Sequence, residues 1–198
     1  MNPRLVIFDC DGVLVDTEMA TNTIIAENLQ SHGLSITPDQ AHTLFAGGTM
    51  ESAGHEARRR GATLPDDWLS EIYDQVFNRL RQGVDVIDGV WDLLNLLKDR
   101  QIAVASNGPM EKMAITLKPS GLWAHFAGRI YSGHDHGPKP APDMLLRIMR
   151  DAGVTAAETV MIDDMRSGCL AAQAAGSAVL DMWRRVIRPA STEQARYL

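Results

Sequence analysis

The chain has 198 residues, of which 45% are hydrophobic and 22% charged, and its formal net charge at pH 7 is −6. This is the composition of a soluble globular protein, and a negative balance without a basic stripe argues against nucleic acid as a partner. No apolar run approaches the ~18 residues of a membrane-spanning helix, and two cysteines are too few for a disulfide framework, so we expect a reduced, cytoplasmic setting.

The first predicted element is a buried strand over Leu5–Phe8, which ends in two aspartates, Asp9 and Asp11, followed by Gly12. Alternation puts both carboxylates on one side, and the glycine lets the chain curl, so that one carboxylate can face a substrate while the next reaches over it. Two close carboxylates raise the proton affinity of one, and a divalent cation keeps the other ionised. Carboxylate oxygen favours Mg²⁺, which also accepts phosphate oxygens as ligands.

The next stretch, from about residue 18 to residue 83, carries helical patterns throughout and no predicted strand. Thr49 has the side chain and position expected of the residue that caps the third of four helices. Four helices inserted after the first strand indicate a small cap domain. We expect an α/β core domain of residues 1–16 and 84–198, a helical cap domain of residues 17–83, and hinges at Asp16–Glu18 and Gln82–Ile87.

Beyond the insert, short apolar strands alternate with amphipathic helices such as "GVWDLLNLLKDR" and "APDMLLRIMRDAG". The strands are predicted at Ile102–Ala105, Arg129–Tyr131, Thr159–Ile162 and Ala178–Leu180. Almost wholly apolar strands are typical of a parallel sheet that is covered on both faces. The alternation therefore predicts a doubly wound parallel α/β sheet with an inserted four-helix cap.

Polar residues also follow the later strands, where ligands bind in an open parallel sheet. They are Ser106, Asn107 and Gly108 after the second strand, Lys139 in the loop after the third, and Asp163 and Asp164 after the fourth. A second acid pair facing the first suits a cation site, a lysine can neutralise phosphate charge, and a hydroxyl with backbone N–H groups can bind phosphoryl oxygens. Each feature alone is more common as a turn or helix cap, but their joint occurrence at one edge favours an active site.

These segments resemble a known family. "DCDGVLVDTE", "SNG", "KPAPD" and "IDDMRSGCLAAQAAG" look like the four ordered motifs of the haloacid dehalogenase superfamily of phosphohydrolases, over residues 4 to about 180. The helical insert resembles the cap of the β-phosphoglucomutase-like and phosphoglycolate-phosphatase-like branch. The resemblance implies a Rossmann-like core with the site at the strand ends.

The resemblance assigns roles to the first three motifs. It implies that Asp9 is the nucleophile and forms an aspartyl-phosphate. Asp11 would protonate the leaving oxygen and later activate water, while its backbone carbonyl binds Mg²⁺. Ser106 matches the phosphate-binding hydroxyl and Lys139 the motif lysine, and Asn107 and Gly108 are expected to help bind the substrate.

In the fourth motif, the spacing to Ala174–Gly176 aligns Asp164 with the direct metal ligand and Asp163 with the outer acid, which acts through water. Met165 stands where a serine is usual, which leaves some of the hydrogen bonding around the site in question. In the cap, Gly48 and Thr49 are expected to contribute to substrate choice.

The function implied is Mg²⁺-dependent hydrolysis of a small phosphorylated metabolite, a sugar phosphate or sugar-acid phosphate, by a monomer or weak homodimer. Asp11 argues against halide displacement, which needs no second carboxylate, and the absence of lysine between Glu18 and Gln82 argues against phosphonate cleavage through a Schiff base. A phosphomutase stays open, although Thr21 stands where such enzymes carry a histidine. A non-catalytic phosphate-binding protein is the other alternative.

The loop "SGHDHGPKP" contains His134 and His136 close to the predicted lysine. A tetrahedral metal site needs more ligands than this loop offers. We interpret it as a polar loop from which either histidine can touch the substrate or the cap.

Overall fold

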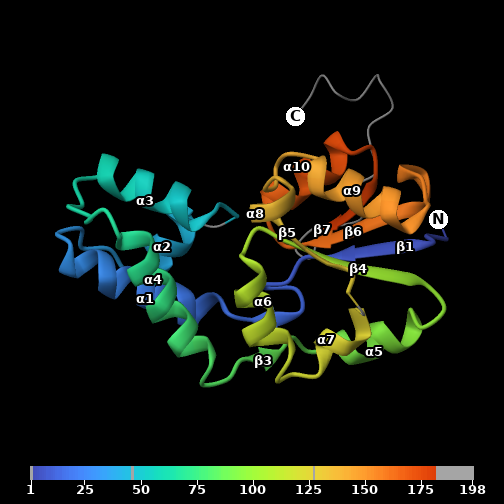
Figure 1. Ribbon diagram of the computed structural model, residues 1–198, viewed down its shortest axis with the longest axis horizontal. Helices are drawn as coiled ribbons and strands as arrows, with labels where there is room; N and C mark the ends of the chain where they lie inside the picture. Colours follow the sequence, from blue (N-terminus) through green and yellow to red (C-terminus); the bar gives the residue numbers. More distant parts are fainter. Residues whose placement is uncertain (1, 46, 127, 182–198) are drawn as a thin grey trace.

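The computed structural model describes residues 2–45, 47–126 and 128–181, and its centre is a five-stranded parallel sheet (Figure 1). The strands are β1 (Leu5–Phe8), β4 (Gln101–Ser106), β5 (Ile130–Ser132), β6 (Thr159–Asp163) and β7 (Ala178–Asp181). Their order across the sheet is β5-β4-β1-β6-β7. The expected doubly wound parallel sheet is confirmed, and β1 lies at the point where the connections change direction, which is where such sheets bind ligands.

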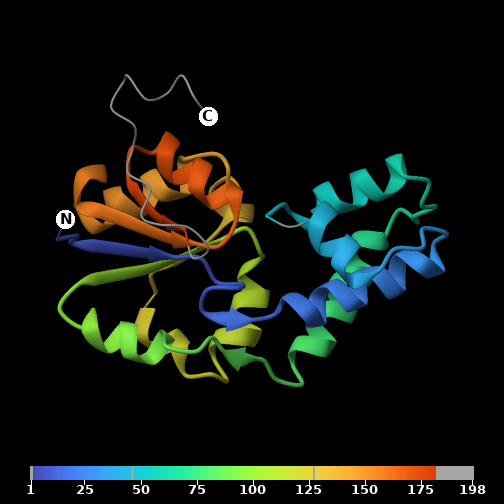
Figure 2. The ribbon, with the colours of Figure 1, turned by 180° about the vertical axis from the view of Figure 1, so that it is seen from behind.

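Helices cover both faces of the sheet (Figures 1 and 2). One face carries α5 (Val90–Leu96), α6 (Met110–Leu117) and α7 (Leu122–Phe126), and the other carries α8 (Gly133–His136), α9 (Asp143–Ala152) and α10 (Arg166–Ala174), with a 3₁₀ turn, η1, at Ala156–Glu158. Because side chains alternate along a strand, Val6 and Phe8 pack with the first set, and Leu5 and Ile7 with the second. A strand buried on both faces is uniformly apolar, which is the pattern that reveals it in the sequence.

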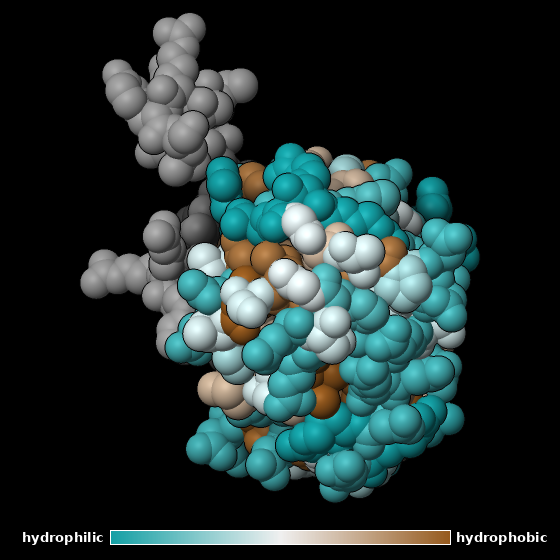
Figure 3. All heavy atoms as spheres, turned by 90° about the vertical axis from the view of Figure 1, so that its left-hand side faces the viewer, coloured by the Kyte–Doolittle hydropathy of each residue, from teal (hydrophilic) through white to brown (hydrophobic). Residues whose placement is uncertain are grey.

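In the described part of the chain, four helices lie between Asp16 and Asp85 and extend beyond the carboxyl ends of the strands (Figures 1 and 2). They are α1 (Glu18–Ser31), α2 (Pro38–Phe45), α3 (Met50–Arg59) and α4 (Trp68–Leu80), as the helical pattern predicts. They pack around a hydrophobic cluster of their own. Figure 3 shows the side of the molecule on which these four helices lie, and this surface is largely hydrophilic. Most large apolar side chains of the helices face inward.

A two-stranded antiparallel ribbon joins the entry and exit of this helical insert. It consists of β2 (Val15–Asp16) and β3 (Asp85–Val86), with Val15 opposite Val86. The sequence analysis predicts hinges here and no strands, because two residues are too few to show an alternation. This pairing holds the segment that enters the helical insert beside the segment that leaves it.

Trp68 connects two of the four helices. It is 2% exposed, and its indole Nε1 donates a hydrogen bond of 2.7 Å to Oδ1 of Asn28 in α1. We predict that Trp68→Phe lowers the free energy of unfolding by about 1–3 kcal/mol, because the buried Asn28 oxygen loses its indole donor. Urea unfolding followed by circular dichroism measures this, with Trp91→Phe at a 40% exposed position as the matched control. Equal losses in both variants would contradict the prediction.

Among the residues that the structure describes, no helix is both long and apolar enough to cross a membrane. Residues 182–198, which complete the expected core domain, lie outside the described part of the chain.

Candidate active site

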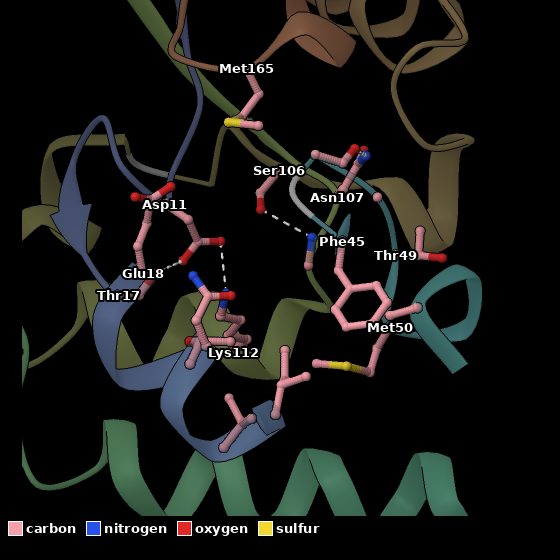
Figure 4. A pocket seen from close by; sticks show the side chains of 18 of the residues that line it. Asp11, Thr17, Glu18, Phe45, Thr49, Met50, Ser106, Asn107, Lys112 and Met165 are labelled. Carbon is pink, nitrogen blue, oxygen red and sulfur yellow. Dashed lines mark hydrogen bonds and ion pairs between the residues drawn. The ribbon is translucent and has the colours of Figure 1, made fainter. Parts of the chain in front are cut away.

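A cavity of about 170 Å³ lies between the strand ends and the helical insert (Figure 4). The predicted site residues that line it are Asp9, Asp11, Ser106, Asn107, Gly108 and Lys139 from the core, and Gly48 and Thr49 from the insert. Asp163 and Asp164 are not part of the lining, but their carboxylates lie beside that of Asp9. The structure therefore brings all the predicted site residues into one region.

Three carboxylates form a compact cluster at the ends of β1 and β6. Asp9, Asp163 and Asp164 each offer one oxygen, and these oxygens lie within 4.8 Å of one another. Oδ1 of Asp164 is buried and has no hydrogen-bonding partner among the residues that the structure describes. An unpaired buried carboxylate oxygen among hard oxygen donors fits a divalent cation such as Mg²⁺.

Gly12 allows this close approach. It has a φ of +75°, and a Cβ atom at this position would lie 2.3 Å from Oδ2 of Asp164. A side chain would therefore push the fourth motif away from the first. The turn that the glycine permits after β1 agrees with the expectation from the sequence.

Lys139 compensates part of the negative charge. Its ammonium is buried and donates hydrogen bonds of 2.8 Å to Oδ1 of Asp9 and to Oδ2 of Asp163. Asp163 also accepts a hydrogen bond of 2.8 Å from the backbone N–H of Met165. This bond comes from the main chain, so the methionine in place of the usual serine does not remove it.

Burial raises the pKa of Asp9 to about 8, and the neighbouring Asp163 and Asp11 add to this rise against the opposing effect of Lys139. Burial and Asp163 likewise raise the pKa of Asp164 to about 7. Both groups are therefore costly to ionise without a further cation, because one lysine does not balance the cluster. A bound divalent cation would favour their ionised forms.

We predict that stabilisation of the protein by Mg²⁺ grows with pH between pH 6 and pH 8.5. The raised pKa values mean that the metal-free protein loses stability as pH rises from the unfolded value of 3.8 to about 8 for Asp9 and about 7 for Asp164. A cation must displace these protons. Below the pKa of each carboxyl, the affinity for the cation therefore falls about tenfold for each unit by which the pH is lowered. Melting temperatures in Mg²⁺ and in EDTA measure the effect, and a larger Mg²⁺-induced rise at pH 6 than at pH 8.5 would contradict it.

The side chain of Asp11 does not belong to the cluster. Its Oδ1 accepts a hydrogen bond of 2.6 Å from Oγ1 of Thr17, and its Oδ2 pairs with Nζ of Lys112 at 2.8 Å (Figure 4). Burial raises the pKa of Asp11, but Lys112 and Thr17 outweigh burial and hold it below the usual value. Asp11 is thus held at the edge of the cavity, on the side of α6.

Asn107 organises the loops around the site. Its amide donates hydrogen bonds to the backbone oxygens of Gly47 at 3.1 Å and of Lys139 at 2.9 Å, and its Oδ1 accepts one from the N–H of Lys139 at 2.7 Å. Ser106 is buried and accepts a hydrogen bond of 3.1 Å from the N–H of Gly108. Asn107 therefore links the lysine loop to the loop between α2 and α3.

In the insert, Thr49 caps α3, as predicted: its Oγ1 accepts from the N–H of Ser52 at 3.2 Å, and the Ser52 hydroxyl accepts from the N–H of Thr49 at 3.0 Å.

A side-chain contact joins α4 of the insert to the core, where Oη of Tyr73 and Nε2 of His134 are 3.3 Å apart. The expected contact of a histidine with the insert is therefore present.

Lys112 is the functional candidate that the sequence analysis missed. It lines the cavity from the first turn of α6. A positive charge so close to the start of a helix opposes the helix dipole. This unfavourable position was the feature of the sequence from which a role for Lys112 could have been inferred.

A parallel α/β sheet with an acidic cluster and a buried lysine at its strand ends, beside a helical insert, defines a hydrolase of the haloacid dehalogenase type. The family model of haloacid dehalogenase-like hydrolases matches residues 3–176. The chain belongs to this family, as the four motifs predict.

Individual relatives agree with this assignment. The chain is 27% identical to 6-phosphogluconate phosphatase of Escherichia coli (strain K12), over 88% of this chain and 80% of that protein. It is 28% identical to a phosphoglycolate phosphatase of Pseudomonas fluorescens, over 88% and 67% of the two chains. A conserved haloacid dehalogenase-like protein of Agrobacterium tumefaciens is 31% identical, with a TM-score of 0.80 and coverage of 91% of this chain and 82% of that chain.

Proposed function

We propose that the protein is a Mg²⁺-dependent phosphatase that hydrolyses a small phosphorylated sugar or sugar acid through an aspartyl-phosphate on Asp9. The observation that carries the proposal is the position of Asp9: its carboxylate lines the cavity, and Lys139 holds it at 2.8 Å beside two further carboxylates. The names of the relatives in Escherichia coli and Pseudomonas fluorescens support a phosphorylated metabolite as substrate.

In this proposal, an oxygen of Asp9 attacks phosphorus in line with the leaving oxygen, and the P–O bond of the ester breaks. Asp11 must first take up a proton from solvent, because, despite its burial, its pairing with Lys112 and Thr17 holds its pKa below the usual value. It then donates this proton to the leaving oxygen and later accepts one from the water that hydrolyses the aspartyl-phosphate. Since Asp11 is paired with Thr17 and Lys112, it must exchange one partner for the leaving oxygen. Ser106 and the N–H groups that follow it bind phosphoryl oxygens.

Asp9, Asp164 and the backbone carbonyl of Asp11 would hold Mg²⁺ directly, with Asp163 as the outer acid. The cation supplies positive charge that neutralises the phosphoryl oxygens and keeps Asp9 ionised. The buried unpaired oxygen of Asp164 supports this assignment. We also propose that residues 17–83 act as a cap domain over a core of residues 1–16 and 84–198.

The lining of the cavity favours hydrolysis over phosphomutase activity. Among the described residues that line it from α1 to α4, none is lysine or arginine, so a second phosphate would lack a strong counter-charge there. Thr21, in the place of the mutase histidine, has a buried hydroxyl without a hydrogen-bonding partner in the described part of the chain.

Phosphate release from a panel of phosphorylated metabolites, with Mg²⁺ and with EDTA, tests the proposal. We expect steady release that requires Mg²⁺. Folded protein that releases no phosphate from any ester, p-nitrophenyl phosphate included, would refute hydrolysis. Isomerisation of a sugar 1-phosphate without net release would identify the mutase instead.

A further inference from the structure

The cavity contains a second lysine that the proposed phosphoryl chemistry does not use. The described basic residues in its lining are Lys112, Lys139 and His42. Lys139 is 4% exposed and shared between two carboxylates. Lys112 has a side chain that is 14% exposed, and its described carboxylate partner is Asp11 alone. An ammonium has three donors, so Lys112 can bind a further anion.

The location of Lys112 does not serve helix stability. It is the third residue of α6 (Met110–Leu117), where a positive charge opposes the helix dipole. Its stem passes beside Gly108, since a Cβ atom at that glycine would lie 3.3 Å from Cδ of Lys112. The glycine thus leaves room for the lysine to reach the cavity.

Lys112 lies on the side of the leaving group. Its Nζ is 2.8 Å from Oδ2 of Asp11, the group proposed to protonate the leaving oxygen. Phe45 and Met50 line the opposite side, from the helical insert (Figure 4). A negative substituent on the leaving group would therefore meet a cation at Lys112 and apolar surface at these two residues.

We propose that Lys112 binds a carboxylate on the leaving group and so selects phosphate esters of hydroxy acids over those of neutral alcohols. This inference rests on the proposed phosphatase function. A carboxylate is favoured over a second phosphate because one ammonium, already paired with Asp11, balances a single added charge better than two. When the ammonium turns to the substrate, it also releases Oδ2 of Asp11 for the leaving oxygen.

Matched substrate pairs test the proposal with purified full-length protein in Mg²⁺. The pairs are 6-phosphogluconate with sorbitol 6-phosphate, and 2-phosphoglycolate with 2-hydroxyethyl phosphate. Each pair exchanges a carboxylate for a hydroxymethyl group. Since a hydrogen bond to a charged group contributes a factor of about 10 to 100, we expect kcat/KM to favour the acid by about that factor in at least one pair.

We expect Lys112→Met to reduce this acid-to-neutral ratio about 10- to 100-fold and Lys112→Arg to retain part of it. Lys118→Met, at an exposed position just after the same helix, should leave the ratio unchanged. An equal loss on both members of each pair in Lys112→Met, or no preference in the wild type, would overturn the inference. Hydrolysis of p-nitrophenyl phosphate separates that result from failure of the phosphatase function itself.

Product inhibition gives a test that does not depend on a folded variant. Wild-type protein should be inhibited by gluconate at a lower concentration than by sorbitol. Equal inhibition by the two products, alongside equal rates on the two esters, would overturn the proposal.

Discussion

Replacing Asp9 by asparagine should abolish phosphate release, with a loss of at least about 10⁴-fold, a size typical of removing a nucleophile. The amide occupies nearly the same volume, but it carries no negative charge and cannot form an acyl-phosphate in one displacement. Steady-state release from the best substrate of the panel measures the loss. Asp99→Asn, which changes the same residue type at an exposed position, is the matched control.

The same substitution should not destabilise the metal-free protein at pH 7.5. Burial raises the pKa of Asp9 to about 8, above its unfolded value of 3.8, so ionisation of this group reduces stability as pH rises through that interval. Asparagine removes the charge, and Lys139 keeps Asp163 as a partner. Urea unfolding in EDTA should therefore give an equal or higher free energy of unfolding for Asp9→Asn.

Two outcomes would argue against Asp9 as the nucleophile. One is a variant that folds normally and keeps more than about a hundredth of the wild-type rate, which is far above the residual activity expected without a nucleophile. The other comes from mass spectrometry of wild-type protein that is quenched in acid during turnover. We expect a phosphoryl group on the peptide that contains Asp9. Its presence on another peptide would move the covalent step elsewhere.

The sheet could be predicted from the sequence because each strand is a short apolar run with a clear end. All five predicted strands overlap those in the structure, with ends that differ by at most one residue. The acidic cluster could be predicted in the same way, because Asp9 and Asp163 each come directly after one of the predicted apolar runs. Parallel strands bring their carboxyl ends to one edge, so these residues meet without any further assumption.

The features that the sequence did not reveal depend on tertiary contacts. The β2–β3 ribbon pairs two residues with two others, and neither half has a pattern of its own. The direction of the Asp11 side chain depends on Lys112, which α6 brings to it from a distant part of the chain. Asn107 resembles a substrate-binding amide in the sequence, whereas its hydrogen bonds in the structure go to the backbones of Gly47 and Lys139.

Replacing Lys139 by methionine should both inactivate the protein and destabilise it by about 3–5 kcal/mol in EDTA at pH 7.5, which is typical of breaking a buried ion pair. Methionine retains much of the length of the stem but leaves Asp9 and Asp163 without the ammonium that lies 2.8 Å from each. The pKa of Lys139 is raised above its ordinary value, chiefly by these two carboxylates against the opposing effect of burial. Its stabilising charge is therefore fully present at neutral pH.

The loss should shrink as pH falls. Asp9 and Asp164, whose pKa values are raised to about 8 and about 7, take up protons between pH 7.5 and pH 5.5. The carboxylate cluster then carries less negative charge, so removing the ammonium costs less stability. Urea unfolding at pH 5.5 and pH 7.5 should show a smaller difference between variant and wild type at the lower pH. Lys98→Met, at an exposed position, should show little change at either pH.

A double-mutant cycle locates the effect. Because Oδ2 of Asp163 is 2.8 Å from the ammonium, Lys139→Met combined with Asp163→Asn should lose less stability than the sum of the two single losses. The second substitution removes a buried charge that the first leaves unpaired. Additive losses, with a pH-independent effect of Lys139→Met, would mean that the lysine stabilises the protein by packing alone and not by holding the carboxylate cluster together.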